Sequence, residues 1–120
     1  MPRVLIVDDA EFIRFSLRLM LEKNGFEVVG AAKDGADGIM KYKELKPDIV
    51  TLDITMPGMD GITALKAITA SDPDAKVVVV SAMGREDIIK DAVMCGAKYF
   101  LVKPFKEEQV LETVRKVLAM

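Results

Sequence analysis

The sequence contains no histidine and no tryptophan, and its single cysteine is Cys95. Without histidine, the chain cannot build a Ser-His or Cys-His nucleophile pair, and it cannot bind a metal through imidazole. One cysteine excludes an internal disulfide and suits a reducing compartment, so we expect a cytoplasmic protein. Any chemistry must therefore come from carboxylates, lysine and hydroxyl groups.

Long apolar runs and blocks of one charge are also missing. No unbroken apolar run exceeds four residues, as in Val77–Val80, whereas a membrane span needs about 20. The N-terminus has no long apolar region and no small-residue cleavage site, which argues against a signal peptide. A net charge of −2 without basic runs argues against nucleic acid as a partner. At 120 residues and 51% hydrophobic, the chain predicts one domain, 1–120, and we expect a monomer.

Short β-rich runs alternate with amphipathic helical stretches along the whole chain. The expected strands are 4–7, 26–31, 48–52, 75–80 and 98–102. The expected helices cover 11–23 and the stretches that begin after Gly35, Asp60, Gly84 and Pro104, with Asp60 as an N-cap. Apolar strands separated by amphipathic helices predict a parallel sheet with helices on both faces, an α/β doubly wound fold.

The helical stretches also predict which side chains are buried. The 11–23 helix has polar residues at helical spacing, namely Glu11, Arg14, Arg18 and Glu22. They predict one solvent-exposed polar stripe on an otherwise apolar, buried helix. The last helix is expected to bury an apolar face that extends to Leu118. Most of the eight methionines are expected to fill the core.

Polar side chains occur where the predicted strands end. Asp8 and Asp9 follow the first strand, Asp53 the third, Ser81 the fourth and Lys103 the fifth. The carboxyl ends of parallel strands lie at one edge of the sheet, where open α/β sheets bind their ligands. If the first and third strands are neighbours, the three aspartates converge in one crevice.

Such a crevice needs positive charge. Two carboxylates about 5 Å apart repel by about 3 kcal/mol at an effective dielectric near 20, so either a proton is shared or a cation is bound. Oxygen ligands favour Mg²⁺, with Mn²⁺ as an alternative. An aspartate beside Mg²⁺ and lysine suits phosphoryl transfer. We assign Asp53 as nucleophile, Asp8 and Asp9 as metal ligands, and Ser81 and Lys103 as partners of phosphoryl oxygens.

Each residue also has a simpler interpretation. Asp9 could cap the first helix, Asp53 could form a turn, and Ser81 could be a cap or turn residue. Lys103 could be a solvated lysine, and Cys95 a buried small apolar residue. These interpretations require four strand ends to carry three acids, a hydroxyl and a lysine by chance. Taken together, the residues favour a functional site.

Four segments make the chain resemble the receiver domain of two-component response regulators, from Val4 to Leu118. They are Val-Asp-Asp at 7–9, Leu-Asp-Ile-Thr-Met-Pro-Gly-Met-Asp-Gly at 52–61, Ser-Ala-Met-Gly at 81–84 and Gly-Ala-Lys-Tyr-Phe-Leu-Val-Lys-Pro-Phe at 96–105. Within this family, the sequences of these four segments are most similar to those of stand-alone chemotaxis regulators of the CheY type. The resemblance implies a flavodoxin-like five-stranded sheet of order 2-1-3-4-5 with five helices.

The resemblance also implies roles for individual residues. Asp53 would be the phosphoacceptor, and the Thr55 backbone carbonyl would join Asp8, Asp9 and Asp53 around the metal. Ser81 and Phe100 occupy the hydroxyl and aromatic switch positions, and Lys103 precedes a proline, Pro104, that is cis in the family. Phe100 stands where many members have tyrosine, so only ring burial is available to the switch. Met83 is apolar where some relatives are polar, which leaves the phosphoryl lifetime unpredicted.

These features predict a signalling switch rather than an enzyme, one that promotes only its own phosphorylation and dephosphorylation. A histidine kinase, CheA-like, would phosphorylate Asp53, and the fourth helix, fifth strand and last helix would then bind the flagellar motor switch. The chain ends after the fifth helix without a DNA-binding module, so we expect a single-domain regulator.

Three alternatives stay open. The chain could be a relay receiver that passes phosphate to a histidine phosphotransfer protein. An aspartate-nucleophile phosphatase would need an acid where Thr55 stands. A flavin carrier would meet an acidic turn at Asp8 and Asp9 that repels the flavin phosphate, and the chain has no glycine-rich phosphate loop.

Overall fold

The computed structural model describes residues 1–56 and 61–120, which form five strands and five helices in strict alternation. The expected N-cap, Asp60, lies outside the described residues. The strands are β1 (Arg3–Val7), β2 (Glu27–Ala32), β3 (Ile49–Asp53), β4 (Val77–Ala82) and β5 (Tyr99–Lys103). The helices are α1 (Glu11–Lys23), α2 (Gly35–Leu45), α3 (Gly61–Ser71), α4 (Glu86–Met94) and α5 (Glu107–Leu118).

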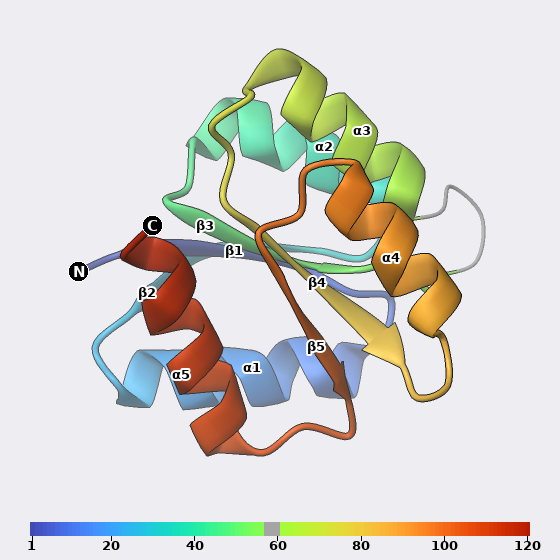
Figure 1. The fold of residues 1–120 in the computed structure, drawn as a ribbon. Coiled ribbons are helices and arrows are strands. Elements are labelled where there is room, and N and C mark those ends of the chain that lie inside the picture. The colour runs from blue at the N-terminus through green and yellow to red at the C-terminus, as the bar shows by residue number, and fades with distance from the viewer. Residues whose placement is uncertain (57–60) are drawn as a thin grey trace.

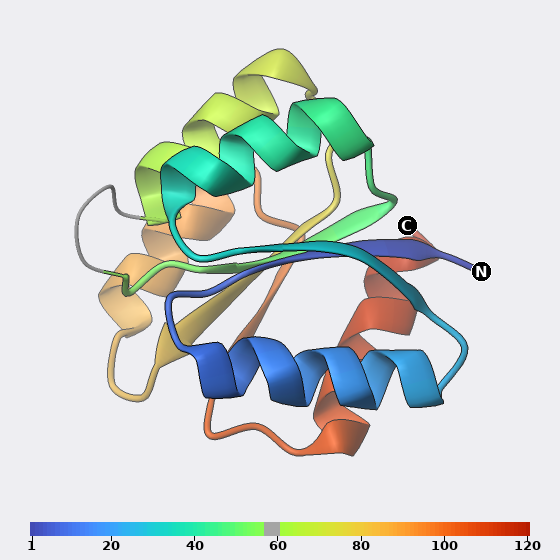
Figure 2. The same ribbon diagram turned by 180° about the vertical axis from the view of Figure 1, so that it is seen from behind.

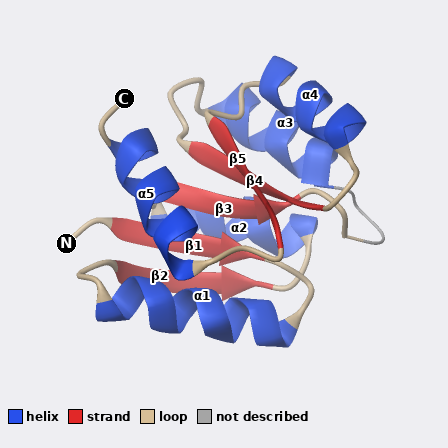
Figure 3. Cartoon of the chain, turned by 60° about the horizontal axis from the view of Figure 1, so that its bottom comes forward, coloured by secondary structure: helices blue, strands red, loops and turns tan. Residues whose placement is uncertain are grey.

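The strands form one parallel sheet in the order β2-β1-β3-β4-β5, which confirms the expected fold class and topology (Figure 3). β3 is the central strand, and all five of its residues are buried. Such a strand has no polar face to place in water, which explains why its sequence does not alternate. Asp53, the last residue of β3, is therefore carried to the edge of the sheet by a fully buried strand.

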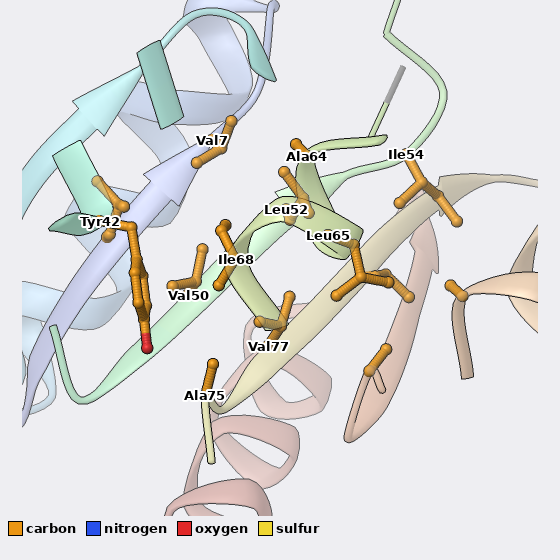
Figure 4. Packing of buried hydrophobic residues seen from close by; sticks show 14 of the residues in the cluster. Val7, Tyr42, Val50, Leu52, Ile54, Ala64, Leu65, Ile68, Ala75 and Val77 are labelled. Atoms are coloured by element: carbon orange, nitrogen blue, oxygen red, sulfur yellow. The ribbon is translucent and has the colours of Figure 1, made fainter. Parts of the chain in front are cut away.

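Helices cover both faces of the sheet, α1 and α5 on one and α2, α3 and α4 on the other (Figures 1 and 2). Alternate residues of β1, β3 and β4 supply the two cores, as expected for period-2 side chains. In β1, Leu5 and Val7 pack toward α2 and α3, whereas Val4 and Ile6 pack toward α1 and α5. Figure 4 shows the core between the sheet and helices α2, α3 and α4.

The helix ends explain how the chain turns between layers. α1 ends at Asn24, and Gly25 has a φ of 89°, a left-handed conformation that glycine adopts without strain. The Asp34 side chain accepts a hydrogen bond from the Asp37 backbone N–H, 2.8 Å away, and so caps α2. The N-cap of α1 is Ala10, which makes no side-chain capping hydrogen bond.

Several burial predictions were wrong. The solvent-exposed surface of α1 extends beyond the polar stripe. The apolar side chains of Phe12, Phe15 and Leu19 are 75%, 59% and 53% accessible to solvent. Leu118 is only partly buried, and so is Cys95. Most of the described methionines lie at the surface rather than in the core, namely Met1, Met40, Met83, Met94 and Met120. Periodicity marks the apolar side of a helix but does not say how much of it another layer covers.

Candidate functional site

Asp8, Asp9 and Asp53 come together at the carboxyl edge of the sheet, as the strand order required. One carboxylate oxygen from each lies within 4.8 Å of the others. β1 and β3 are paired with Val7 opposite Leu52, so the residues that follow them are neighbours. Asp8 and Asp53 are buried, with 1% and 2% of their surface exposed, whereas Asp9 is exposed. The result is an acidic cluster of two buried carboxylates and one exposed carboxylate.

Lys103 is the cation of the pocket. Its Nζ lies 3.0 Å from Asp8 Oδ2 and donates a hydrogen bond to Asp53 Oδ2 at 3.1 Å. Burial lowers the pKa of this lysine, but its contacts with the two negatively charged aspartates outweigh burial and raise it. The peptide bond between Lys103 and Pro104 is cis, as the resemblance implied. Lys103 is therefore a charged, half-buried partner of both carboxylates rather than a solvated lysine.

Asp8 is held on three sides. Its backbone N–H donates to the carbonyl oxygen of Ala32 at the end of β2 (3.0 Å), and its Oδ1 accepts from the backbone N–H of Ala10 (2.9 Å). Among the described residues, no group makes a directed hydrogen bond to Oδ2, although Lys103 forms an ion pair with it. Burial raises the pKa of this carboxyl, against the lowering effect of the Ala10 N–H and Lys103.

The two carboxylate oxygens of Asp53 have different partners. Oδ1 accepts hydrogen bonds from the backbone N–H and the hydroxyl of Thr55, both at 2.8 Å. Oδ2 contacts Lys103 alone among the described residues. The turn interpretation of Asp53 is thus correct for Oδ1, whereas Oδ2 accepts its hydrogen bond from Lys103. The Thr55 hydroxyl was missed from the sequence, although Asp-x-Thr is a known turn pattern that could have indicated it.

The residues of the proposed switch lie on the two neighbouring strands. Ser81 is fully buried in β4, and its hydroxyl donates to the carbonyl oxygen of Ala82 at 2.9 Å rather than to Asp53. Phe100 is in β5, where its ring is 37% exposed and packs 5.3 Å from the Tyr99 ring, centroid to centroid. Met83, beyond the end of β4, is 72% exposed. The structure places Ser81 near the site but does not bond it to the other site residues.

The cap interpretation of Asp9 was wrong. The N-cap position of α1 belongs to Ala10, and the Ala10 N–H is bound by Asp8. Asp9 is exposed at the rim of the pocket beside two buried carboxylates. Asp9 is therefore not the N-cap of α1, and its carboxylate forms part of the acidic cluster.

The donor set fits a divalent cation. The three carboxylate oxygens lie within 4.8 Å of one another, and Lys103 forms ion pairs with Asp8 and Asp53. Two unit charges about 5 Å apart repel by about 3 kcal/mol at an effective dielectric near 20. All available donors are oxygen atoms, and Asp8 Oδ2 is buried without a directed hydrogen bond. Hard oxygen ligands with an open rim for water suit Mg²⁺ better than a softer metal. Asp8, Asp9 and Asp53 are the residues that could hold it.

Residues 4–115 match the model of the response regulator receiver domain. The doubly wound parallel sheet and the acidic cluster at its carboxyl edge agree with this match, and the chain belongs to the response regulator receiver family. Among curated proteins, chemotaxis protein CheY of Bacillus subtilis is 54% identical over 116 residues, 97% of each chain. CheY of Thermotoga maritima is 54% identical over 115 residues, 96% of each chain. The chain is therefore a receiver domain closely related to the CheY chemotaxis regulators.

Solved structures agree. The response regulator domain of Thermotoga maritima CheB superposes with a TM-score of 0.91 at 36% identity, covering 100% of this chain and 98% of the other. CheY in a CheX-CheY-BeF3-Mg²⁺ complex from Borrelia burgdorferi superposes with a TM-score of 0.91 at 45% identity, covering 96% and 87%. Among the described residues, no helix is long and apolar enough to cross a membrane.

Proposed function

We propose that the protein is a phosphoaspartate switch in which Asp53 accepts a phosphoryl group from a histidine kinase, with Mg²⁺ as the cofactor. The observation that carries this proposal is the unequal environment of the Asp53 carboxylate. Thr55 holds Oδ1 with two hydrogen bonds, while Oδ2 contacts only Lys103 among the described residues. One oxygen is thus fixed and the other is presented to an incoming phosphorus atom.

The chain's own residues account for most of the transfer. Asp53 Oδ2 attacks phosphorus, the P–N bond of the donor phosphohistidine breaks, and the electron pair of that bond stays on the imidazole. Lys103, already 3.1 Å from Oδ2, stabilises negative charge on the phosphoryl oxygens. Asp8, Asp9, Asp53 and the Thr55 carbonyl would hold Mg²⁺. When bound, the ion neutralises charge that otherwise repels the donor.

The switch residues would carry the change outward. The Ser81 hydroxyl donates only to the carbonyl oxygen of the next residue, Ala82. It can therefore turn to donate to a phosphoryl oxygen without breaking a contact between different elements. Ser81 pairs with Val102 in the β4–β5 ladder, two positions from Phe100. A shift at Ser81 would open space toward which the half-exposed Phe100 ring can turn. The proposed output is the surface formed by α4, β5 and α5.

That surface suits a target protein. A groove between β5 and α5 is lined by Phe100, Gln109, Glu112 and Lys116 among others. The Lys116 Nζ lies 4.6 Å from the centroid of the Tyr99 ring, a cation–π contact that links the strand to the helix. Because the relatives are chemotaxis CheY proteins, we propose a CheA-like kinase as donor and the flagellar motor switch as target. We further propose a cytoplasmic, monomeric regulator whose receiver domain spans residues 1–120 and which turns over no external substrate.

Two alternatives make different predictions. A relay receiver would pass its phosphoryl group to a histidine phosphotransfer protein, and it would be captured by that protein when activated. An aspartate phosphatase needs a general acid for the leaving group. Thr55 stands where that acid is expected, and its hydroxyl is bound to Asp53. Sustained hydrolysis of a generic phosphate ester would favour the phosphatase.

The test is labelling with acetyl phosphate in the presence of Mg²⁺. We expect about one phosphoryl group per chain, counted by intact-protein mass spectrometry, and none for Asp53→Asn or for the parent in excess chelator. Asp91→Asn, a change at an exposed aspartate of α4, is the matched control and should be labelled like the parent. Equal labelling of Asp53→Asn and the parent would rule out the proposal.

A further inference from the structure

Arg14, in the second turn of α1, reaches back across the loop that carries the acid pair. Its Nη1 donates to the backbone carbonyl oxygen of Asp8 at 2.7 Å. Its own backbone N–H donates to the carbonyl oxygen of Ala10 at 3.1 Å, the first bond of the helix. One residue therefore ties the start of α1 to the start of the metal loop. Arg14 has no carboxylate partner among the described residues, so its guanidinium binds a backbone carbonyl oxygen and forms no ion pair.

With this bond, Asp8 and its neighbour are fully tethered. The Asp8 N–H is bound by Ala32, its carbonyl by Arg14 and its Oδ1 by the Ala10 N–H. Asp9 sits between two residues whose backbones are fixed. Its exposed side chain can therefore vary only about its own torsions, and its Cα stays at the rim of the pocket.

We propose that Arg14 is a positioning residue for the metal site, holding the β1–α1 loop so that Asp8 and Asp9 are ready to bind Mg²⁺. This inference rests on the proposed function, because it assumes that the acid cluster binds the ion. Residues that orient metal ligands without touching the metal commonly matter for affinity. Ala10, the N-cap of α1, makes no side-chain capping hydrogen bond, so the bonds of Asp8 and Arg14 hold the start of this helix.

The sign of the effect separates this role from simple electrostatics. A cationic guanidinium near a cation site opposes metal binding through its charge, so its removal would tighten binding if charge alone mattered. A positioning role predicts the reverse. Arg14→Met keeps the length of the stem but loses both the charge and the donor. We expect it to weaken Mg²⁺ binding by about 10-fold or more.

The experiment measures binding of Mg²⁺ alone to the full chain by isothermal titration calorimetry, with Mn²⁺ followed by electron paramagnetic resonance as a second readout. Arg14→Lys keeps the charge and one donor and should lose about two- to fivefold in affinity. Arg18→Met is the matched control, because the Arg18 guanidinium lies one turn further along α1, 3.5 Å from a Glu22 carboxylate oxygen. Arg18→Met should bind Mg²⁺ as the parent does.

Thermal melts without metal show whether each variant folds. If Arg14→Met does not fold, Arg14→Lys decides, and an affinity at or above that of the parent would overturn the positioning role. If Arg14→Met folds and binds Mg²⁺ as tightly as the parent or more tightly, the inference fails while the proposed function stands. A parent chain that binds no Mg²⁺ would overturn both.

Discussion

Asp8 is a buried acid whose environment suits a metal complex better than the metal-free fold. Its side chain is almost fully covered, and burial raises its pKa. We predict that Asp8→Asn raises the stability of the metal-free protein by about 1 kcal/mol, because the amide oxygen still accepts from the Ala10 N–H and no charge is buried. The measurement is urea unfolding in excess chelator, with the exposed Asp91→Asn as control. Lower stability of Asp8→Asn would contradict this.

The same residue predicts a pH dependence. A carboxyl whose pKa is higher in the folded chain stabilises the fold while protonated, and this contribution is lost as the pH rises through the folded pKa. The metal-free parent should therefore lose stability as the pH rises above the ordinary range of aspartate, and Asp8→Asn should lose less. Added Mg²⁺ should stabilise the parent more than the variant.

At the scale of single residues, the sequence indicated which side chains meet but not how they bond. The positions of Asp8, Asp9, Asp53 and Lys103 followed from strand ends. The turn at Asp53 could have indicated its bond to the Thr55 N–H, whereas the bond from Arg14 to Asp8 depends on the exact path of the loop and could not be predicted. Cα placement follows from topology, whereas hydrogen bonds depend on tenths of an ångström.

Helix α3 illustrates how an element is seated against the site. It begins at Gly61, where an added Cβ would overlap the Asp53 carbonyl oxygen and the Ile54 Cα, both backbone atoms. We predict that Gly61→Ala destabilises the fold by about 1–3 kcal/mol through this overlap, although alanine favours a helix interior by about 1 kcal/mol over glycine. Urea unfolding measures the loss. Lys66→Ala, at an exposed position of the same helix, should stay within about 0.5 kcal/mol of the parent.

A Gly61→Ala protein that is as stable as the parent would show that the backbone can move away without penalty. If the overlap is instead relieved by moving Asp53, acetyl phosphate labelling should also slow. At this scale the sequence predicted every described helix and strand within a few residues. It could not predict the outer face of α1, because three large apolar side chains there satisfy helical periodicity while facing solvent.

For the molecule as a whole, the proposed function requires phosphorylation and output to be separable. We predict that Phe100→Ala is labelled by acetyl phosphate like the parent but loses phosphorylation-dependent binding to a flagellar motor switch protein by about 10-fold or more, as for an interface hot spot. Pull-down with purified switch protein, with and without acetyl phosphate, measures this. The matched control is Phe15→Ala, which removes an exposed phenyl ring from α1, on the opposite side of the sheet from α4. This variant should bind the switch protein as the parent does. Loss of labelling in Phe100→Ala would contradict the separation.

The overall architecture was predictable for a physical reason. Alternating apolar strands and amphipathic helices leave few ways to bury both faces of a parallel sheet. The strand order itself came from the family resemblance, since periodicity does not tell β1 from β2 as the neighbour of β3.

The pairing of β4 with β5, with Ala82 opposite Lys103, has a practical consequence. A slip of one residue would turn every β5 side chain to the other face, and the lysine would then point away from the two acids it now contacts. A misfolded population of this kind would keep its helices and look native by far-ultraviolet circular dichroism. It would lack the contacts of Lys103 with Asp8 and Asp53, so under the proposed function we expect it to react with acetyl phosphate more slowly than correctly aligned chains.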